Sequence, residues 1–273
     1  MSSTSDTDGW TDSQWQSFID TRTNEILSSL SDTTITPSTS FSSIVSASDP
    51  LLPLSIDHTL LKPEATPEQV DSLCDEALKY GFKSCCVNTI YAKRVAEQLK
   101  GSNTIVCCVV GFPLGAASAQ AIASEARLAI QDGAAEIDMV LPVGLLLSPS
   151  PPYAEIYHHV RTVIQGSGPV PVKVIIETVL LKFQEKKIAA CLLAAEAGAA
   201  FVKTCTGFSG GQATEEDVRL MWHAVRSYNA KEEGKVKVKA SGGVRTLQSC
   251  LAMLKAGAER IGTSSGAALV TSQ

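Results

Sequence analysis

From residue 50 onward, short apolar runs alternate with longer segments whose apolar positions recur every three to four residues. The short runs have the length and β-branched content of buried strands, and the longer segments have the period of amphipathic helices. The predicted strands are Leu54–Asp57, Ser84–Val87, Ile105–Val110, Glu136–Val140, Val172–Glu177, Phe201–Thr204, Val236–Ala240 and Arg260–Gly262. The predicted helices lie over 67–80, 89–99, 118–132, 153–165, 182–197, 214–227 and 246–256, and a last short helix follows Ser264.

This alternation predicts the fold class. Gly81, Gly133, Gly198 and Gly257 each follow a predicted helix, which is where C-terminal glycines of helices occur. Strands that alternate with helices in this way indicate an α/β protein, and eight such units predict a (β/α)8 TIM barrel with an N-terminal extension. A doubly wound open sheet is the alternative, because periodicity does not show whether the sheet closes. The chain has no glycine motif typical of dinucleotide or nucleoside triphosphate sites.

The N-terminal segment 1–49 differs in composition from residues 50–273. It contains 23 Ser or Thr residues and no Lys, and its net charge of −6 within a total of −5 leaves the remainder at +1. Apolar spacing predicts a helix over 12–30, and residues 31–49 have the composition of a flexible linker. We expect this helix to pack on the barrel or to be disordered. A partner-docking helix or a phosphorylated regulatory tail is the functional alternative.

Overall composition excludes several classes of protein. A net charge of −5 and a pI of about 5.4 argue against a nucleic-acid partner. No apolar run reaches the roughly 18 residues of a membrane helix, and no secretory signal begins the chain. The eight cysteines form no C-x-x-C pair and the histidines have no metal-ligand spacing. We therefore expect reduced, mostly buried thiols in a cytoplasmic protein.

Two lysines carry the strongest chemical signal. Lys203 and Lys239 fall at or near the C-terminal ends of predicted strands six and seven, where the active sites of such barrels lie. A lysine with apolar neighbours and a second ammonium nearby can lose its proton and attack a carbonyl. Asp138, within an apolar strand, is a candidate proton shuttle. The structural alternative is a set of buried ion pairs between these lysines and Asp138 or Glu177.

Three clusters rich in Gly or Ser, at 206–211, 241–243 and 262–266, follow late strands. Glycine lets backbone N–H groups approach an anion, and the helix N-terminus that follows favours negative charge. Barrel phosphate sites commonly use the loops after strands seven and eight. The clusters therefore predict a phosphate site, although ordinary turns also require glycine.

Taken together, the motifs resemble those of deoxyribose-phosphate aldolases. The matching segments are IDHTLL (56–61), CVN (86–88), VGFPLG (110–115), EIDMV (136–140), KVIIET (173–178), FVKT (201–204), GF (207–208), KASGGVRT (239–246) and RIGTSSG (260–266). They cover residues 54–270 in order. The resemblance implies a class I aldolase on a TIM barrel, with no metal and no cofactor. Residues 1–49 lie outside the shared pattern, and Cys205 stands where many members have Ser.

The resemblance also implies an activity and the residues that perform it. The expected reaction is reversible cleavage of 2-deoxy-D-ribose 5-phosphate to D-glyceraldehyde 3-phosphate and acetaldehyde, in deoxyribonucleoside catabolism. Lys203 is then the Schiff-base lysine, Lys239 the second lysine that activates it, and Asp138 the acid/base group. The implied substrate- and phosphate-binding residues are Gly207, Gly242, Gly243, Gly262, Ser264 and Ser265, with Lys173 and Asp57 in an inner polar network. The family pattern is compatible with a homodimer.

Two other functions remain open at this point. A different Schiff-base barrel enzyme, such as a transaldolase-like protein, would share Lys203 but accept other aldehydes. A non-catalytic barrel would have its function in residues 1–49, acting as an interaction module. Deletion of residues 1–49 separates the enzyme from the interaction module, and a panel of aldehydes separates the two enzymes.

Overall fold

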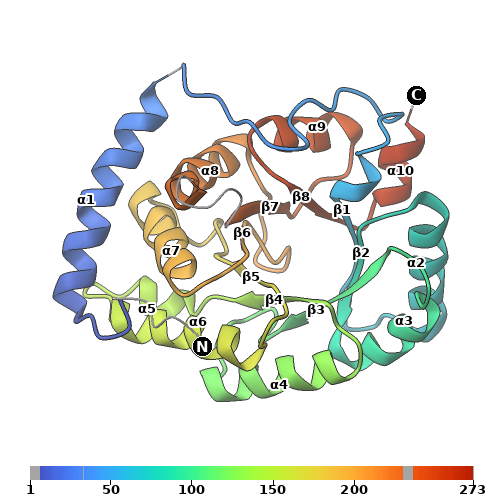
Figure 1. The fold of residues 1–273 in the computed structure, drawn as a ribbon, viewed down its shortest axis with the longest axis horizontal. Coiled ribbons are helices and arrows are strands. Elements are labelled where there is room, and N and C mark those ends of the chain that lie inside the picture. The colour runs from blue at the N-terminus through green and yellow to red at the C-terminus, as the bar shows by residue number, and fades with distance from the viewer. Residues whose placement is uncertain (1–6, 33, 230–235, 273) are drawn as a thin grey trace.

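A closed parallel barrel forms the centre of the molecule (Figure 1). The computed structural model describes residues 7–32, 34–229 and 236–272. Its strands are β1 (Ile56–Leu60), β2 (Ser84–Asn88), β3 (Ile105–Val110), β4 (Glu136–Val140), β5 (Val172–Ile175), β6 (Phe201–Lys203), β7 (Lys237–Ser241) and β8 (Arg260–Thr263). They pair in sequence order and in parallel, and β8 closes on β1. The predicted TIM barrel is confirmed, and the open sheet is excluded.

Helices surround the barrel and connect its strands. They are α2 (Pro67–Tyr80), α3 (Ala92–Gln98), α4 (Ala119–Gln131), α6 (Tyr153–Gly166), α7 (Gln184–Glu196), α8 (Glu215–Asn229), α9 (Leu247–Lys255) and α10 (Gly266–Thr271). Local sequence sets their ends. In α2, the Thr66 side chain accepts from the Gln69 amide, Pro67 opens the helix, and Gly81 ends it in the left-handed conformation with φ 70°.

Some predicted boundaries were wrong. Pro53–Ser55 form a 3-10 turn, so the first strand begins at Ile56 and Asp57 lies near its start, not at its end. The predicted fifth strand ends at Ile175, and Glu177 adopts a φ of 55° that no strand residue has. A short helix, α5 (Val143–Leu146), follows β4 and was not predicted. Ile105–Val110 and Glu136–Val140 have the predicted bounds, and β2, β6, β7 and β8 differ from the prediction by one residue at one or both ends.

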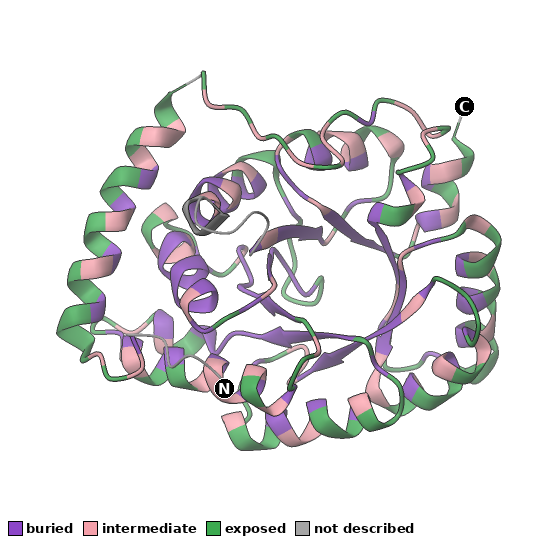
Figure 2. Cartoon of the chain, viewed as in Figure 1, coloured by how far each residue is buried: buried purple, intermediate pink, exposed green. Residues whose placement is uncertain are grey.

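The N-terminal helix α1 (Asp12–Ser31) lies against α6, α7 and α8 (Figure 1). Trp15, Ile19, Thr23 and Ile26 are buried on the face it turns to the barrel. This cover explains α7, whose residues 188–195 are all buried (Figure 2). A helix without a polar face needs neighbours on every side, and α6, α8, β6 and α1 provide them.

Polar contacts fix α1 at both ends. At its start, Asp12 Oδ1 accepts from the Ala154 amide at 2.8 Å and so caps α6, whose own N-cap residue forms no side-chain hydrogen bond. Near its end, Ser29 Oγ lies 2.9 Å from His223 Nδ1 on α8. Of the two structural expectations for this helix, packing on the barrel is the one observed.

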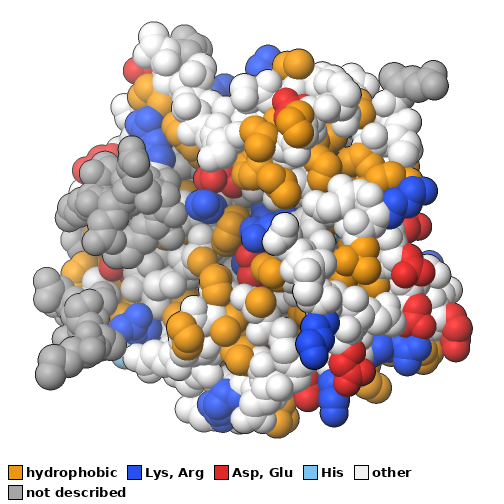
Figure 3. Space-filling model, turned by 45° about the vertical axis from the view of Figure 1, so that its right-hand side comes forward, with side chains coloured by type: hydrophobic (Ala, Val, Ile, Leu, Met, Phe, Trp, Pro, Cys, Tyr) orange, Lys and Arg blue, Asp and Glu red, His pale blue; other side chains and the backbone are white. Residues whose placement is uncertain are grey.

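The segment that joins α1 to β1 runs past α8 and α9 on the outside of the barrel, and its described residues form no helix or strand before the 3-10 turn at Pro53. Ile44 is buried within it, and Phe41 packs against the core. Among the described helices, none combines the length and apolar content that a membrane span requires. On the face drawn in Figure 3, acidic and basic side chains lie interspersed at the lower right, so no single sign dominates there.

Candidate active site

Charged side chains fill the barrel interior. Register explains their meeting, because Asp138 is opposite Lys173 on β4 and β5, and Lys203 is opposite Lys239 on β6 and β7. Alternate residues of each strand point inward, and these positions carry the charges. We call the set the inner charge network: Asp57, Glu136, Asp138, Lys173, Lys203, Lys239 and Arg260. No side chain in it is more than 8% exposed.

Asp138 is the centre of this network. Its Oδ2 accepts from Lys203 Nζ at 2.7 Å and from Lys239 Nζ at 2.8 Å, and its Oδ1 accepts from Lys173 Nζ at 2.7 Å. Burial raises the pKa of the Asp138 carboxyl, but the three ammonium groups outweigh it and hold that pKa well below its usual range. Asp138 is therefore an ionised carboxylate that draws three lysines to one point.

A second carboxylate, Asp57, lies deeper in the barrel. Its Oδ1 accepts from Ser84 Oγ at 2.6 Å and from Arg260 Nη1 at 2.7 Å, and its Oδ2 lies 2.5 Å from Lys239 Nζ. Burial opposes ionisation, but Arg260 and the lysines lower the pKa of Asp57. Arg260 also donates to Glu136, at 2.9 Å. The sequence reasoning did not single out Arg260; its one signal is a charge at an inward strand position.

The three lysines differ in their ion pairs. Lys173 lies 2.7 Å from both Glu136 and Asp138, and Lys239 pairs with Asp57 and Asp138. Although burial acts against them, these carboxylates raise the pKa of both lysines, so both stay charged. Lys203 pairs only with Asp138 among the described residues. Loss of a proton from Lys203 therefore breaks one ion pair, whereas loss from Lys173 or Lys239 breaks at least two.

Potential metal ligands also meet inside the barrel. Cys86, Cys107 and Asp138 lie close together, as do Asp57, Cys107 and Glu136. However, Lys173 Nζ already lies 3.2 Å from Cys107 Sγ and 2.7 Å from the carboxylates of Asp138 and Glu136. Because an ammonium occupies the place that a cation would take, these residues do not fit a metal ion.

The predicted phosphate loops follow β6, β7 and β8, which are neighbours in the barrel. Gly207, Gly242 and Gly243 have φ of 85°, 99° and 76°, which residues with a Cβ rarely adopt. The amides of Gly207, Gly243 and Ser264 meet no acceptor among the described residues, and all three residues are exposed. The Ser265 amide instead donates to Thr263 Oγ1 at 2.9 Å. The loops thus present free donors at one rim of the barrel.

Gly262 has a packing role inside the barrel. A Cβ at this position would lie 2.0 Å from Ser241 Oγ and 3.0 Å from Lys239 Cε. Only glycine therefore fits beside Lys239. Gly262 lies on the β8 strand within the barrel, whereas Gly207, Gly243 and Ser264 lie on its rim.

An apolar cavity of about 530 Å³ opens at the mouth of the barrel. The rings of Phe112 and Phe208 meet there edge to face with centroids 5.2 Å apart. Its lining comes from the end of β2 and from the segments that follow β1, β2, β3 and β6: Leu61, Lys62, Pro63, Asn88, Ile90, Tyr91, Phe112, Pro113 and Phe208. The mouth thus has one apolar side and one side of glycine-rich loops.

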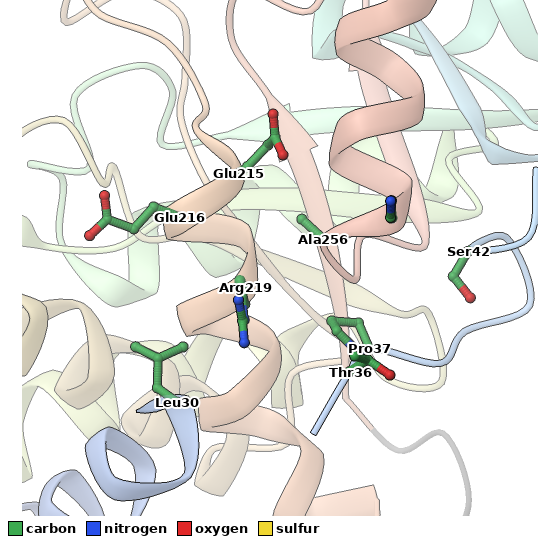
Figure 4. Close-up of a pocket in the computed structure, with 9 residues that line it drawn as sticks. Leu30, Thr36, Pro37, Ser42, Glu215, Glu216, Arg219 and Ala256 are labelled. Carbon is green, nitrogen blue, oxygen red and sulfur yellow. The ribbon is translucent and has the colours of Figure 1, made fainter. Parts of the chain in front are cut away.

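A second cavity, of about 780 Å³, lies outside the barrel between the 36–42 segment, α8 and α9 (Figure 4). Leu30, Arg219 and Pro37 are among its lining residues, and Glu215 and Glu216 lie at its α8 end. None of its lining residues belongs to the inner charge network or to the phosphate loops. This cavity is therefore separate from the candidate active site.

Comparison with known proteins identifies the family. The model of the DeoC/LacD family aldolases matches residues 52–271. A deoxyribose-phosphate aldolase of Brevibacillus brevis is 51% identical over 216 residues, which cover 79% of this chain and 93% of that protein. A deoxyribose-phosphate aldolase of Clostridium kluyveri is also 51% identical over 216 residues, covering 79% of this chain and 94% of its own length.

Solved structures of similar proteins support the same family assignment. A candidate deoxyribose-phosphate aldolase from Coccidioides immitis superposes with a TM-score of 0.84 at 35% identity, over 96% of this chain and 98% of that one. The unmatched 4% is about eleven residues, so most of segment 1–49 also has a counterpart there. The tetrameric deoxyribose phosphate aldolase of Aeropyrum pernix superposes with a TM-score of 0.71 at 31% identity, over 82% and 91% of the two chains. The chain belongs to the DeoC/LacD family and is an aldolase.

Proposed function

We propose that this aldolase reversibly cleaves 2-deoxy-D-ribose 5-phosphate to D-glyceraldehyde 3-phosphate and acetaldehyde through a Schiff base on Lys203. The observation that carries the proposal is the position of Lys203. It ends β6 at the barrel mouth, has one carboxylate partner 2.7 Å away, and lies beside Lys239, which is charged. Relatives about half identical to this chain are named for the same substrate.

Charge balance supports Lys203 as the nucleophile. With every group ionised, the inner charge network holds four cations and three carboxylates. A neutral Lys203 makes the count equal, and its loss of charge breaks the fewest ion pairs. The neutral amine then attacks C1 of the open-chain sugar, and loss of water gives an iminium ion.

The iminium ion withdraws electrons from the C2–C3 bond. A base removes the proton from the hydroxyl on C3, and the C2–C3 bond breaks. Glyceraldehyde 3-phosphate then leaves, and an enamine remains bound to Lys203. Protonation of the enamine at C2 and hydrolysis release acetaldehyde. Asp138 is the proposed proton carrier, directly or through water, because its ionised carboxylate touches Lys203 and Lys239. Lys239 supplies the neighbouring positive charge.

The phosphate group is proposed to bind at the rim formed by the loops after β6, β7 and β8. Free backbone donors at Gly207, Gly243 and Ser264 support this assignment, and a dianion attracts such donors strongly. Gly242 shapes the middle loop, and Ser265 occupies the N-cap position of α10 without a side-chain capping hydrogen bond. Lys173 and Asp57 are proposed to hold Asp138 and Lys239 in place.

The cellular setting belongs to the same proposal. All eight cysteines are buried, unpaired thiols, which fits a reducing compartment such as the cytoplasm. Deoxyribonucleoside catabolism would supply the sugar phosphate. The homodimer remains a prediction.

Borohydride trapping tests the mechanism. The full chain is incubated with deoxyribose 5-phosphate and sodium borohydride, and peptides are analysed by mass spectrometry. We expect one reduced adduct on Lys203, none in Lys203→Ala, and an unchanged adduct in Lys62→Ala, which removes an exposed lysine at the mouth. Folded protein without an adduct, or an adduct that persists in Lys203→Ala, would contradict the proposal.

A further inference from the structure

Glu177 combines features that ordinary loop residues lack. It follows β5, it is buried, and among the described residues it alone has a positive φ without being glycine, at 55°. This conformation is unfavourable for a residue with a Cβ. The neighbouring peptides are held to β6, because the Ile176 amide donates to the Lys203 carbonyl at 2.9 Å and the Thr178 amide to the Thr204 carbonyl at 3.0 Å. The strained residue is therefore fixed between two anchored neighbours.

The Glu177 carboxylate points at the loop after β6. The Thr206 amide donates to both of its oxygens at 3.3 Å, the Thr206 hydroxyl donates to Oε2, and Ser209 Oγ donates to Oε2 at 3.1 Å. Thr206 Oγ1 in turn accepts from the Phe208 amide at 3.0 Å. No described Lys or Arg forms an ion pair with Glu177. Its contacts are therefore with loop donors alone.

The loop is held again at its far end. The Ala213 amide donates to the Gly242 carbonyl at 2.9 Å, and a Cβ on Gly211 would lie 2.7 Å from Val179 Cγ1. Gly207, with its free amide, lies between these two anchors. The path from the strained Glu177 to the Gly207 amide contains only the one residue Thr206.

We infer that Glu177 is a positioning residue that holds the Gly207 amide in its phosphate-binding orientation. This inference rests on the proposed function, since it deepens the phosphate site. Glu177 itself does not touch the reacting atoms. It is a negative charge beside a site for a negative group, so its direct electrostatic effect on phosphate is repulsive. The strained backbone of Glu177 and its hydrogen bonds to the loop have the opposite effect, because they orient the Gly207 amide and so favour phosphate binding.

The two effects predict opposite changes in KM for deoxyribose 5-phosphate when the Glu177 charge is removed. Glu177→Gln removes the repulsion but also replaces one acceptor oxygen by an NH2 group facing the Thr206 and Ser209 donors. If Glu177 positions the loop, KM for deoxyribose 5-phosphate rises by about tenfold or more, the size expected for losing one or two charged hydrogen bonds. If its charge is what matters, KM falls. KM for unphosphorylated deoxyribose and kcat should change less than about threefold.

Ser209→Ala removes one of the same hydrogen bonds from the loop side and should shift KM in the same direction by a smaller factor. Glu215→Gln, at the start of α8, makes the same change in net charge without a hydrogen bond to the loop and is the matched control. The competitive inhibition constant of inorganic phosphate against deoxyribose turnover should rise in parallel with KM in the Glu177 and Ser209 variants.

The outcomes separate the two proposals. A wild-type enzyme that does not cleave deoxyribose 5-phosphate removes the proposed function before any variant is compared. With an active wild type, an unchanged or lowered KM in Glu177→Gln overturns the positioning role. Equal losses on both sugars also overturn it, because they indicate a structural defect. If Glu177→Gln does not fold, Ser209→Ala and phosphate inhibition decide the question in the same way.

Discussion

Replacing Asp138 by Asn removes the charge that three lysines share while keeping the shape of the side chain. In the wild type, Asp138 accepts from Lys173, Lys203 and Lys239 at 2.7–2.8 Å and has no exposed surface. The variant retains four cations against two carboxylates in the inner charge network. Breaking a buried ion pair by removing one partner costs about 3–5 kcal/mol, and we expect this loss in the free energy of unfolding near pH 7.

In the Asp138→Asn variant, one buried lysine can release its proton, which limits the loss in the free energy of unfolding and makes that loss depend on pH. A lysine with the ordinary pKa of about 10.4 releases its proton at pH 7 for about 5 kcal/mol and at pH 9 for about 2 kcal/mol. A folded variant that has released a proton binds fewer protons than its unfolded state, so its stability rises with pH. Asp138 of the wild type is ionised in both states over this range, because its folded pKa is lowered. The ionisation of Asp138 therefore makes no contribution to the pH dependence of wild-type stability between pH 7 and pH 9.

Urea unfolding of both proteins at pH 7 and pH 9 measures the effect. The difference between them should fall by up to about 1.4 kcal/mol per pH unit, and comparing two proteins cancels the ionisation of the other groups. Turnover of the variant should drop at least about a hundredfold, as for loss of a general acid/base. A destabilisation below about 1 kcal/mol, or one that grows with pH, would refute the assignment of charges in the barrel.

Two further predictions follow from single contacts. Lys239→Leu leaves the Asp57 and Asp138 carboxylates without one partner, so turnover should slow by at least about tenfold and need a higher pH; an unchanged pH–rate profile would argue against Lys239 as the activating charge. Trp15→Ala should lower the free energy of unfolding by about 3–5 kcal/mol in urea titrations, since Trp15 is fully buried on the face of α1 that packs on the barrel, with kcat within about twofold of wild type. Half-buried Phe18→Ala should cost less, and equal stability of Trp15→Ala and wild type would show that α1 is not part of the cooperative fold.

Much of the fold was predictable because barrel strands and helices have different periods. Ile105–Val110 occurs as expected because it is a continuous apolar run, and Glu136–Val140 occurs as expected because it lies between Gly133 and Pro142, which leave little choice of ends. The predicted start of the first strand was wrong because Leu54 continues its apolar pattern, whereas Pro53 starts a 3-10 turn that lasts to Ser55. The hydrophobic periodicity does not distinguish the turn from a strand. As a result, Asp57 was predicted at the rim of the barrel, whereas it lies deep inside it.

The site was predictable to a different degree. Strand order alone puts Lys203 beside Lys239, so their meeting follows from the barrel. The contact of Asp138 with three lysines at once does not, because it depends on side-chain length and on the twist of four strands. The sequence analysis placed Glu177 at a strand end and named it as a possible ion-pair partner of Lys203 and Lys239, but among the described residues these lysines pair with Asp57 and Asp138 instead. The positive φ of Glu177 and its contacts with Thr206 and Ser209 require coordinates, since no pattern in the sequence distinguishes a strained carboxylate from an ordinary one.

The network also explains why Arg260 lies at the end of the barrel away from the reaction. Without it, the only cationic partners of buried Asp57 and Glu136 would be lysines, and each lysine would be held more tightly by its carboxylates. Arg260 stays charged at every pH of interest and pairs with both, which leaves Asp138 as the one carboxylate shared by three lysines. Sharing weakens the hold on any one of them. In the proposed mechanism, Lys203, which has the fewest ion-pair partners of the three lysines, is then the one that attacks the carbonyl.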